Sequence, residues 1–169
     1  MPSPPLRALL APAAVAACAL VACGSAVPIS GATPTPACAT PEGTPETDSF
    51  TQQVPLTTGA GGLRFGDIRV GCGAAVHSGQ IVTVEYTGWL SNGQEFDSSR
   101  TAGRQPFAFP LGQQQVIPGF EQGVMGMHIG GKRRLEIPPA LGYGPQGVPP
   151  TIPPSATLVF DVEVVSASS

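Results

Sequence analysis

The chain has 169 residues, enough for one folded domain with extensions but short for two full-size domains. Apolar residues make up 41% of it, enough for a packed core, while the contents of Gly 22 and Pro 20 indicate many turns and an irregular segment. The formal net charge of −3 at pH 7 argues against nucleic acid as a partner, because no basic surface is available to neutralise phosphates.

An apolar run over residues 8–22 predicts a signal peptide, because it is shorter than the roughly 20 residues that a membrane-spanning helix needs. The run ends in Leu20-Val21-Ala22-Cys23-Gly24, which resembles the lipobox of bacterial lipoproteins. The resemblance implies a lipoprotein signal peptide over 1–23 that ends at a lipidated Cys23. Acyl chains would then hold the protein at the cell envelope, on the outer face of the membrane. The alternative is an ordinary cleaved signal and a secreted protein.

Residues 24–56 are rich in Pro, Thr and Ser and show neither a helical nor a strand period, which predicts a flexible tether. If Cys18 leaves with the signal and Cys23 is lipidated, Cys38 and Cys72 remain. In an oxidising compartment these two could form a disulfide or stay free thiols, and the sequence leaves both alternatives open. The two histidines, His77 and His128, lack ligand spacing, so we expect exposed loop residues, no metal site and no cofactor.

Short alternating runs predict strands in a folded domain over 57–169. The clearest is 80–87, QIVTVEYT, in which Val82, Val84 and Tyr86 share one face. Ser91-Asn92-Gly93 then predicts a tight reversal, because Asn-Gly tolerates positive φ. Further strands are predicted at 107–109, at 132–138 and at 157–165, the last with Leu158, Phe160, Val162 and Val164 on one face.

A single short helix is predicted to begin at Pro118, a residue that suits the first helical position. Phe120, Val124 and Met127 follow at helical spacing and would face the sheet. Glycines inside this segment make it a weak helix, so tertiary packing must hold it. The sequence therefore predicts an α+β domain, a small antiparallel sheet laid against one short helix.

Residues 142–147, GYGPQG, match the pattern G-x-G-x-x-G of dinucleotide-binding proteins. That fingerprint requires a following helix, whereas the prolines of VPPTIPP at 148–154 forbid one, so the dinucleotide interpretation fails. The remaining interpretation is an apolar loop, stiffened by proline, that carries Tyr143, Val148 and Ile152 and can form one wall of a pocket.

Four successive blocks resemble the signatures of FKBP-type peptidyl-prolyl cis-trans isomerases, in the order of that family and across about 78–165. They are VEYTGWLSNGQEFDSSR, PFAFPLGQQQVIPGFEQGV, GGKRRLEIPPALGYG and IPPSATLVFDVEVV. The resemblance implies a five- or six-stranded antiparallel sheet curled around a short helix, with a hydrophobic pocket between them. It also implies that proline-containing polypeptides are the substrates and that macrolides are ligands.

Matching the blocks residue by residue implies three catalytic residues, Tyr86, Asp97 and Tyr143. The implied substrate-binding residues are Phe96, Phe107, Val116, Ile117, Phe120, Val148, Ile152 and Phe160. Phe120 stands where the family often has tryptophan, Val148 stands where well-known members have histidine, and the loop after Arg100 is one residue longer. The resemblance further implies that the Ile117 N–H and the Tyr143 hydroxyl bind substrate carbonyls.

Each of these residues also has a plainer interpretation. Asp97 at the head of Asp-Ser-Ser is typical of a turn-capping residue. Phe96, Phe107 and Phe160 would be ordinary core residues, Arg100 a solvated surface charge, and residues 132–134 a strand and turn facing water.

A site with aromatic residues and one carboxylate but no nucleophile suits a reaction that makes no covalent bond. Rotation about a peptide bond faces a barrier of about 18–20 kcal/mol, and a dry pocket favours the twisted, less polar amide over the planar ground state. We therefore predict a monomeric prolyl isomerase that acts on exported proteins. The alternatives are a non-catalytic proline-peptide-binding or chaperone module at the cell envelope, and a dimeric isomerase with a helical arm.

Overall fold

The computed structural model describes residues 48–169. The signal peptide predicted at 1–23, Cys23, Cys38 and the tether up to residue 47 lie outside the described residues, so these predictions stay predictions. The strands are β1 (Thr57–Thr58), β2 (Arg64–Arg69), β3 (Ile81–Leu90), β4 (Glu95–Ser98), β5 (Phe107–Pro110), β6 (Lys132–Ile137) and β7 (Leu158–Ser168). The helices are α1 (Pro118–Val124) and two short 3-10 helices, η1 (Ala60–Gly62) and η2 (Pro139–Leu141).

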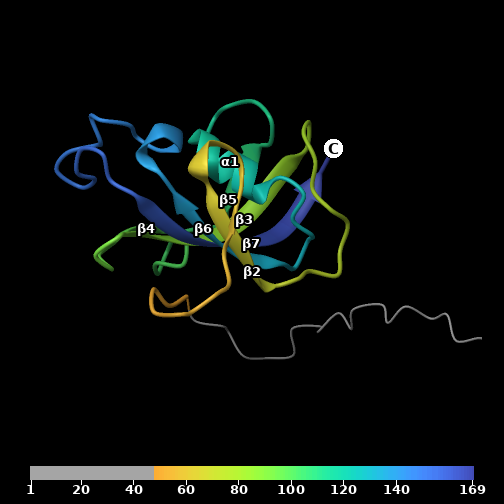
Figure 1. Ribbon diagram of the computed structural model, residues 1–169. Helices are drawn as coiled ribbons and strands as arrows, with labels where there is room; N and C mark the ends of the chain where they lie inside the picture. Colours follow the sequence, from red (N-terminus) through yellow and green to blue (C-terminus); the bar gives the residue numbers. More distant parts are fainter. Residues whose placement is uncertain (1–47) are drawn as a thin grey trace, which may run out of the picture. The chain divides into compact units, whose positions relative to one another are not determined.

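The strands form one antiparallel sheet in the order β1-β2-β6-β7-β3-β4, with β5 also paired to β3. Its central pair is β3 and β7, which pair from Ile81↔Ser168 to Leu90↔Leu158 with one register shift between Thr83 and Val84. The sheet curves around α1, which lies on one side of it (Figure 1). This confirms the predicted fold class. The sheet has seven strands rather than the five or six that the family resemblance implies, and one of the seven, β1, has only two residues.

Strand β3 extends beyond the predicted 80–87, to Leu90. Its first half alternates in burial, but from Thr87 to Leu90 every residue is buried, because both faces of the sheet are covered there. The period-2 signal on which the prediction depended therefore ends before the strand does. The predicted reversal is confirmed: Gly93 has φ +87° and its N–H donates to the Leu90 carbonyl at 2.9 Å.

Helix α1 is shorter than its apolar stripe, because it ends at Val124. Met127 was expected on the same helix but follows it, although its side chain is only 2% exposed and belongs to the same core. The two helix glycines that bring α1 close to the sheet are Gly119 and Gly123. A Cβ on Gly123 would lie 2.5 Å from the methyl groups of Leu135 on β6, and one on Gly119 would lie 2.4 Å from Ile137.

The chain before β1 lies against the outer face of the sheet, and we call residues 48–56 the N-terminal strap. The guanidinium of Arg134 donates to the carbonyls of Ser49 at 2.6 Å and Phe50 at 3.2 Å. The side chain of Asp48 is only 4% exposed. The last part of the predicted tether therefore packs on the domain, and the folded part begins by Asp48 rather than near residue 57.

The strap also explains why two basic residues predicted to face water, Lys132 and Arg134, do not. Lys132 is fully buried and pairs with Asp48 at 2.8 Å, and Arg134 is 5% exposed and pairs with Asp161 at 2.7 Å. Arg100 also contacts Asp48, at 3.0 Å, but its side chain stays 33% exposed, as expected of a surface charge. The predictions for Lys132 and Arg134 were wrong because they assumed that the outer face of β6 is open to solvent.

Cys72 lies in the exposed loop after β2 and is disulfide-bonded. It is the one cysteine among the described residues, so its partner lies outside them, and pairing with Cys38 stays a prediction. His77 and His128 are exposed, as expected. Between Asp48 and the C-terminus, no helix is long and apolar enough to cross a membrane.

Candidate active site

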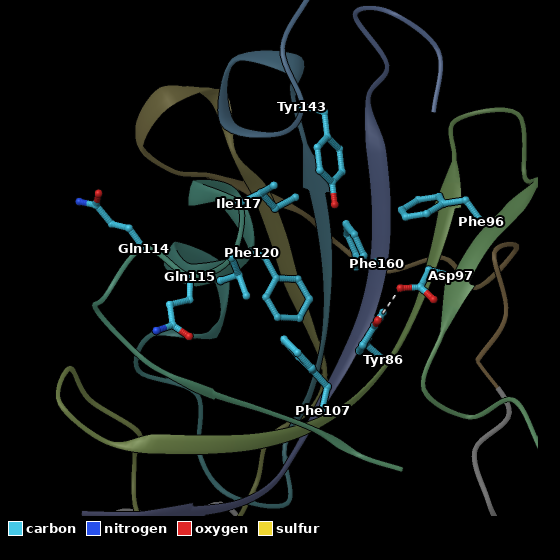
Figure 2. A pocket seen from close by; sticks show the side chains of 11 residues that line it. Tyr86, Phe96, Asp97, Phe107, Gln114, Gln115, Ile117, Phe120, Tyr143 and Phe160 are labelled. Atoms are coloured by element: carbon cyan, nitrogen blue, oxygen red, sulfur yellow. Dashed lines mark hydrogen bonds between the residues drawn. The ribbon is translucent and has the colours of Figure 1, made fainter. Parts of the chain in front are cut away.

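A cavity of about 440 Å³ lies on the α1 side of the sheet, within the size range of small-molecule binding sites. Figure 2 shows its lining side chains, which come from β3, β4, β5, β7, α1 and two loops. The lining residues are Tyr86, Phe96, Asp97, Phe107, Gln114, Gln115, Val116, Ile117, Phe120, Tyr143 and Phe160.

The floor of the cavity is Phe120, on α1, which is only 4% exposed. Its ring meets Tyr86 edge-on at 5.9 Å between centroids and Phe160 at 5.3 Å. Phe96 in turn meets Phe160 edge-on at 5.5 Å. Edge-to-face pairs at these separations are favourable, so the rings hold one another in place and form a fixed apolar wall of the cavity.

The one carboxylate of the cavity, Asp97, is held from several sides. Tyr86 donates its hydroxyl to Oδ2 at 2.5 Å (Figure 2), and the backbone N–H of Ser98 donates to Oδ1 at 3.0 Å. The guanidinium of Arg104 forms an ion pair with Oδ1 and also donates to the Ser98 carbonyl at 2.8 Å. The Ser98 N–H belongs to the next residue, whereas a turn-capping aspartate bonds the N–H two residues on, and Tyr86 and Arg104 lie 11 and 7 residues away from Asp97.

These contacts set the protonation states in the cavity. Burial, reinforced by the hydrogen bond to Asp97, holds the pKa of Tyr86 well above its ordinary value. Burial alone would raise the pKa of Asp97, but hydrogen bonds from Tyr86 and Arg104 outweigh it and lower that pKa. Burial also raises the pKa of Tyr143. At neutral pH the cavity therefore holds an ionised Asp97 and two neutral phenols.

Two donors at the cavity wall have no acceptor within residues 48–169. The N–H of Ile117, just before α1, is one, and the hydroxyl of Tyr143 is the other. Figure 2 shows that the Tyr143 hydroxyl points into the cavity. A polar ligand that presents carbonyl oxygens could satisfy both donors.

Sequence reasoning missed Gln114, Gln115 and Arg104. The two glutamines belong to the loop before α1, and Gln114 has φ +56°, an uncommon conformation for a residue with a side chain. Glu121 on α1 stabilises this loop, since its Oε1 accepts from the N–H of Gly112 at 2.7 Å and from that of Gln114 at 3.2 Å. All three residues lie in loops, and a loop leaves no periodic pattern in the sequence from which they could be predicted.

Two predicted substrate-binding residues, Val148 and Ile152, do not line the cavity. They form a β-bridge within their own loop, with two backbone hydrogen bonds of 2.8 Å. This bridge turns Ile152 into the core, where it is 5% exposed, and leaves Val148 exposed to solvent. The other predicted cavity residues are brought together as expected.

Comparison with known proteins identifies this arrangement. The family model described as FKBP-type peptidyl-prolyl cis-trans isomerase matches residues 72–165. The chain belongs to this family. The match includes every lining residue of the cavity, so this FKBP-type domain carries the whole candidate site within its family region.

Curated relatives of this FKBP-type chain are about half identical to it. A protein of Neisseria meningitidis serogroup B named FK506-binding protein is 50% identical over 105 residues, which are 62% of this chain and 95% of the relative. FK506-binding protein 4 of Dictyostelium discoideum is 52% identical over 107 residues, or 63% of this chain but only 29% of the relative. The peptidyl-prolyl cis-trans isomerase FKBP15-2 of Arabidopsis thaliana is 50% identical over 97 residues, 57% of this chain and 59% of the relative.

Solved structures agree with the fold. AtFKBP13 superimposes with a TM-score of 0.63 at 38% identity, covering 68% of this chain and 99% of that one. FkpA from Escherichia coli gives a TM-score of 0.62 at 42% identity, covering 70% of this chain and 54% of that one. Family, relatives and structures together show that the chain is an FKBP-type peptidyl-prolyl isomerase.

Proposed function

We propose that this isomerase acts on X-Pro bonds of exported polypeptides at the cell envelope, by stabilising the twisted amide without any covalent step. The observation that supports the mechanism most directly is the open aromatic cavity of about 440 Å³, with two unpaired donors at its wall. A five-membered proline ring can enter such a space, because the rings of its wall pack edge-on around it rather than filling it.

The chemistry follows from the amide itself. An X-Pro bond isomerises in tens to hundreds of seconds, because twisting breaks the resonance between nitrogen and carbonyl. The twisted amide is less dipolar than the planar one, so an apolar site favours it over the planar ground state. None of the side chains that line the cavity is a serine, cysteine, lysine or histidine, and this reaction needs no nucleophile.

Roles for the cavity residues follow from their positions. Phe120 and its neighbouring rings would hold the proline ring, while the Ile117 N–H and the Tyr143 hydroxyl would bind the flanking carbonyls. Asp97 would orient the Tyr86 hydroxyl and place its negative charge beside the carbonyl carbon as the bond twists. Because Arg104 and Tyr86 keep it ionised, this charge is present at neutral pH.

Exchange spectroscopy on a short Phe-Pro peptide tests this function. We expect micromolar protein to accelerate cis/trans exchange, and Asp97→Ala to reduce that acceleration about tenfold or more, as loss of one preorganised charge typically does. Asp67→Ala is the matched control, since Asp67 is paired with Arg133 outside the cavity. Unchanged exchange with the wild-type protein would leave only a non-catalytic binding module.

The location at the envelope is proposed from the sequence near Cys23. We propose that this thiol is lipidated and anchors the domain to the outer face of the membrane. Mass spectrometry of the mature protein should show an acylated N-terminal cysteine, and Cys23→Ala should move the protein from the membrane fraction to the soluble one. An unmodified Cys23 in membrane-free material would contradict the anchor.

We also propose that the cavity binds macrolides such as FK506, as the names of the Neisseria and Dictyostelium relatives indicate for those proteins. FK506 should compete with the Phe-Pro peptide, and titration in the exchange assay measures it. We further propose that the domain is a monomer, which sedimentation at increasing concentration tests.

A further inference from the structure

Asp48, the first described residue, carries a carboxylate buried against the outer face of the sheet. Its Oδ1 pairs with the ammonium of Lys132 at 2.8 Å. Its Oδ2 accepts hydrogen bonds from the Thr87 hydroxyl at 2.5 Å and from Nε of Arg100 at 3.0 Å. A carboxylate with a 4% exposed side chain and three partners is fixed in both position and charge.

This carboxylate lies directly behind the Tyr86–Asp97 pair. Thr87 follows Tyr86 on β3, and Ser98 follows Asp97 on β4, and the two are register partners. Since successive side chains of a strand point to opposite faces, Tyr86 and Asp97 reach the cavity while Thr87 and Ser98 face outward. Figure 1 shows the start of the strap (orange) on the side of the sheet away from α1.

Hydrogen bonds connect the two faces through Ser98. Its hydroxyl lies 3.0 Å from the Thr87 hydroxyl and 3.2 Å from the Tyr86 carbonyl, and its N–H donates to Asp97 at 3.0 Å. Thr87 has one hydroxyl proton, and Asp48 accepts it, so Thr87 is the acceptor in its contact with Ser98, and the single Ser98 proton is shared between Thr87 and the Tyr86 carbonyl. Asp48 thereby sets the direction of donation in the chain of hydroxyl groups behind the cavity.

The position of Asp48 is itself fixed by two arginines. Arg100, which follows β4, also pairs with Glu163 on β7 at 2.6 Å, so it ties Asp48 to the end of β4. Arg134 holds the next residues of the strap through the carbonyls of Ser49 and Phe50. The strap therefore has one register on the sheet, set by charge-assisted bonds rather than by apolar contact alone.

We infer that Asp48 is a positioning residue for the Tyr86–Asp97 pair, acting through Thr87 and Ser98 from the far face of the sheet. The inference rests on the proposed function, because it assigns Asp48 a part in the work of that cavity. Asp48 thereby links the N-terminal strap to the geometry of the site. Its hydrogen bond from Thr87 on β3, and the contact of Thr87 with Ser98 on β4, connect the strap to both strands behind the cavity.

The test compares variants of the full chain in the Phe-Pro exchange assay, at a temperature where circular dichroism shows each one fully folded. We expect Asp48→Ala to lower kcat about fivefold with KM within about twofold, because a small displacement of Asp97 affects the twisted state more than binding. Asp48→Asn keeps an oxygen acceptor for Thr87 and should recover much of the loss. The 13C shift of the Tyr86 ring carbon that bears the hydroxyl should move in Asp48→Ala and return in Asp48→Asn.

Two further variants separate positioning from simple stabilisation. Thr87→Val should reproduce the loss, and the double variant with Asp48→Ala should be no worse than either single one, because both act along one path. Phe50→Ala loosens the strap at its contact with Trp89 without touching Thr87, and should lower Tm but not kcat.

Wild-type kcat and an unmoved Tyr86 shift in Asp48→Ala, with only Tm lowered, would overturn the inference and leave the proposed function intact. Additive losses in the double variant would also overturn it. Absence of exchange catalysis by the wild-type protein would overturn both the inference and the proposed function.

Discussion

Asp97 collects donors from three parts of the chain: the hydroxyl of Tyr86 on β3, the N–H of Ser98 beside it, and the guanidinium of Arg104 in the following loop. Two of these contacts join residues of different segments, so the carboxylate is positioned by tertiary structure rather than by a local turn. Both contacts favour its ionised form, and the pKa of Asp97 is lower than its ordinary value of 3.8.

The stability of the protein should depend on pH through this group. Because the pKa of Asp97 is lower in the folded state than in the unfolded one, its contribution is present above the unfolded pKa and is lost as the pH falls through the folded pKa. We predict that the difference in unfolding free energy between wild type and Asp97→Asn is constant from about pH 7 to about pH 5 and shrinks below about pH 4. Urea titrations over this range measure it. A difference that stays constant at the lowest pH would contradict the assignment.

The hydrogen bond from Tyr86 helps to lower the pKa of Asp97. Tyr86→Phe removes the hydroxyl that donates at 2.5 Å, so the pKa of Asp97 should rise toward its ordinary value. Tyr143→Phe is the matched control, because the Tyr143 hydroxyl makes no hydrogen bond to Asp97 and its removal should leave that pKa nearly unchanged. Carboxyl 13C titration of both variants decides between these outcomes, and equal shifts would refute the special role of Tyr86.

At the scale of elements, the cavity depends on how closely one short helix approaches the sheet. Gly119 and Gly123 lower the intrinsic stability of α1, as the sequence indicates, but they also leave no side chain between α1 and β6. Phe120 can serve as the cavity floor because the helix backbone lies against Leu135 and Ile137. The sequence could predict the weak helix but not this close approach, which depends on which face of β6 it meets.

Alanine at one of these glycines should therefore destabilise the protein, although alanine favours helices. In Gly123→Ala the new Cβ would lie 2.5 Å from Leu135, and we predict a loss of about 1–3 kcal/mol in unfolding free energy from overpacking. Gln122→Ala, at the exposed neighbouring position, should change it by less than about 0.5 kcal/mol. Urea denaturation of both variants tests this, and a stabilised Gly123→Ala protein would show that helix propensity outweighs packing here.

The loop before α1 is held in place by one side chain of the helix, Glu121. Glu121 accepts hydrogen bonds from the N–H groups of Gly112 and Gln114, which hold the loop that carries Gln115, Val116 and Ile117. Glu121→Ala should raise KM for the Phe-Pro peptide by about three- to tenfold with a smaller change in kcat, because this wall of the cavity loses its fixed position. Glu121→Gln keeps an oxygen acceptor and should lie closer to wild type. A kcat effect with unchanged KM would contradict a role in holding the binding wall.

At the scale of the whole molecule, the outer face of the sheet is covered by the N-terminal strap and by buried ion pairs. Arg134 contributes to both, because its guanidinium pairs with Asp161 at 2.7 Å and also donates to strap carbonyls. Burial raises the pKa of Asp161 even though Arg134 opposes this, so the carboxyl depends on its arginine to remain charged.

Breaking the Arg134–Asp161 pair should lower the free energy of unfolding strongly. Arg134→Ala leaves the carboxylate of Asp161 buried without its partner, and we predict a loss of about 3–5 kcal/mol in unfolding free energy. Arg64→Ala removes an arginine that pairs with Glu136 while remaining half exposed, and should cost less than about 1 kcal/mol. Denaturant titration compares the two variants. Equal losses would show that burial of the Arg134 pair is not what makes it important.

The sequence predicted the fold class, the central strands and most of the cavity, because alternation in 80–87 and 157–165 and the family-like blocks report directly on buried faces. It did not predict that Lys132 and Arg134 are buried, since local sequence does not show that a segment some 80 residues earlier covers their face. Nor could it place Val148 and Ile152, whose β-bridge leaves Val148 exposed to solvent and Ile152 buried in the core. The first error therefore lies where distant segments meet, and the second lies within an irregular loop.

We propose that this cavity lowers the barrier to X-Pro rotation without forming a bond or transferring a proton. The most direct measurement is the cis/trans exchange rate of a Phe-Pro peptide with the wild-type protein in H2O and in D2O. We expect clear acceleration in both solvents, with rates that differ by less than about 1.5-fold, because no proton is transferred as the amide twists. Absence of acceleration, or a rate in D2O lower by about twofold or more, would contradict it.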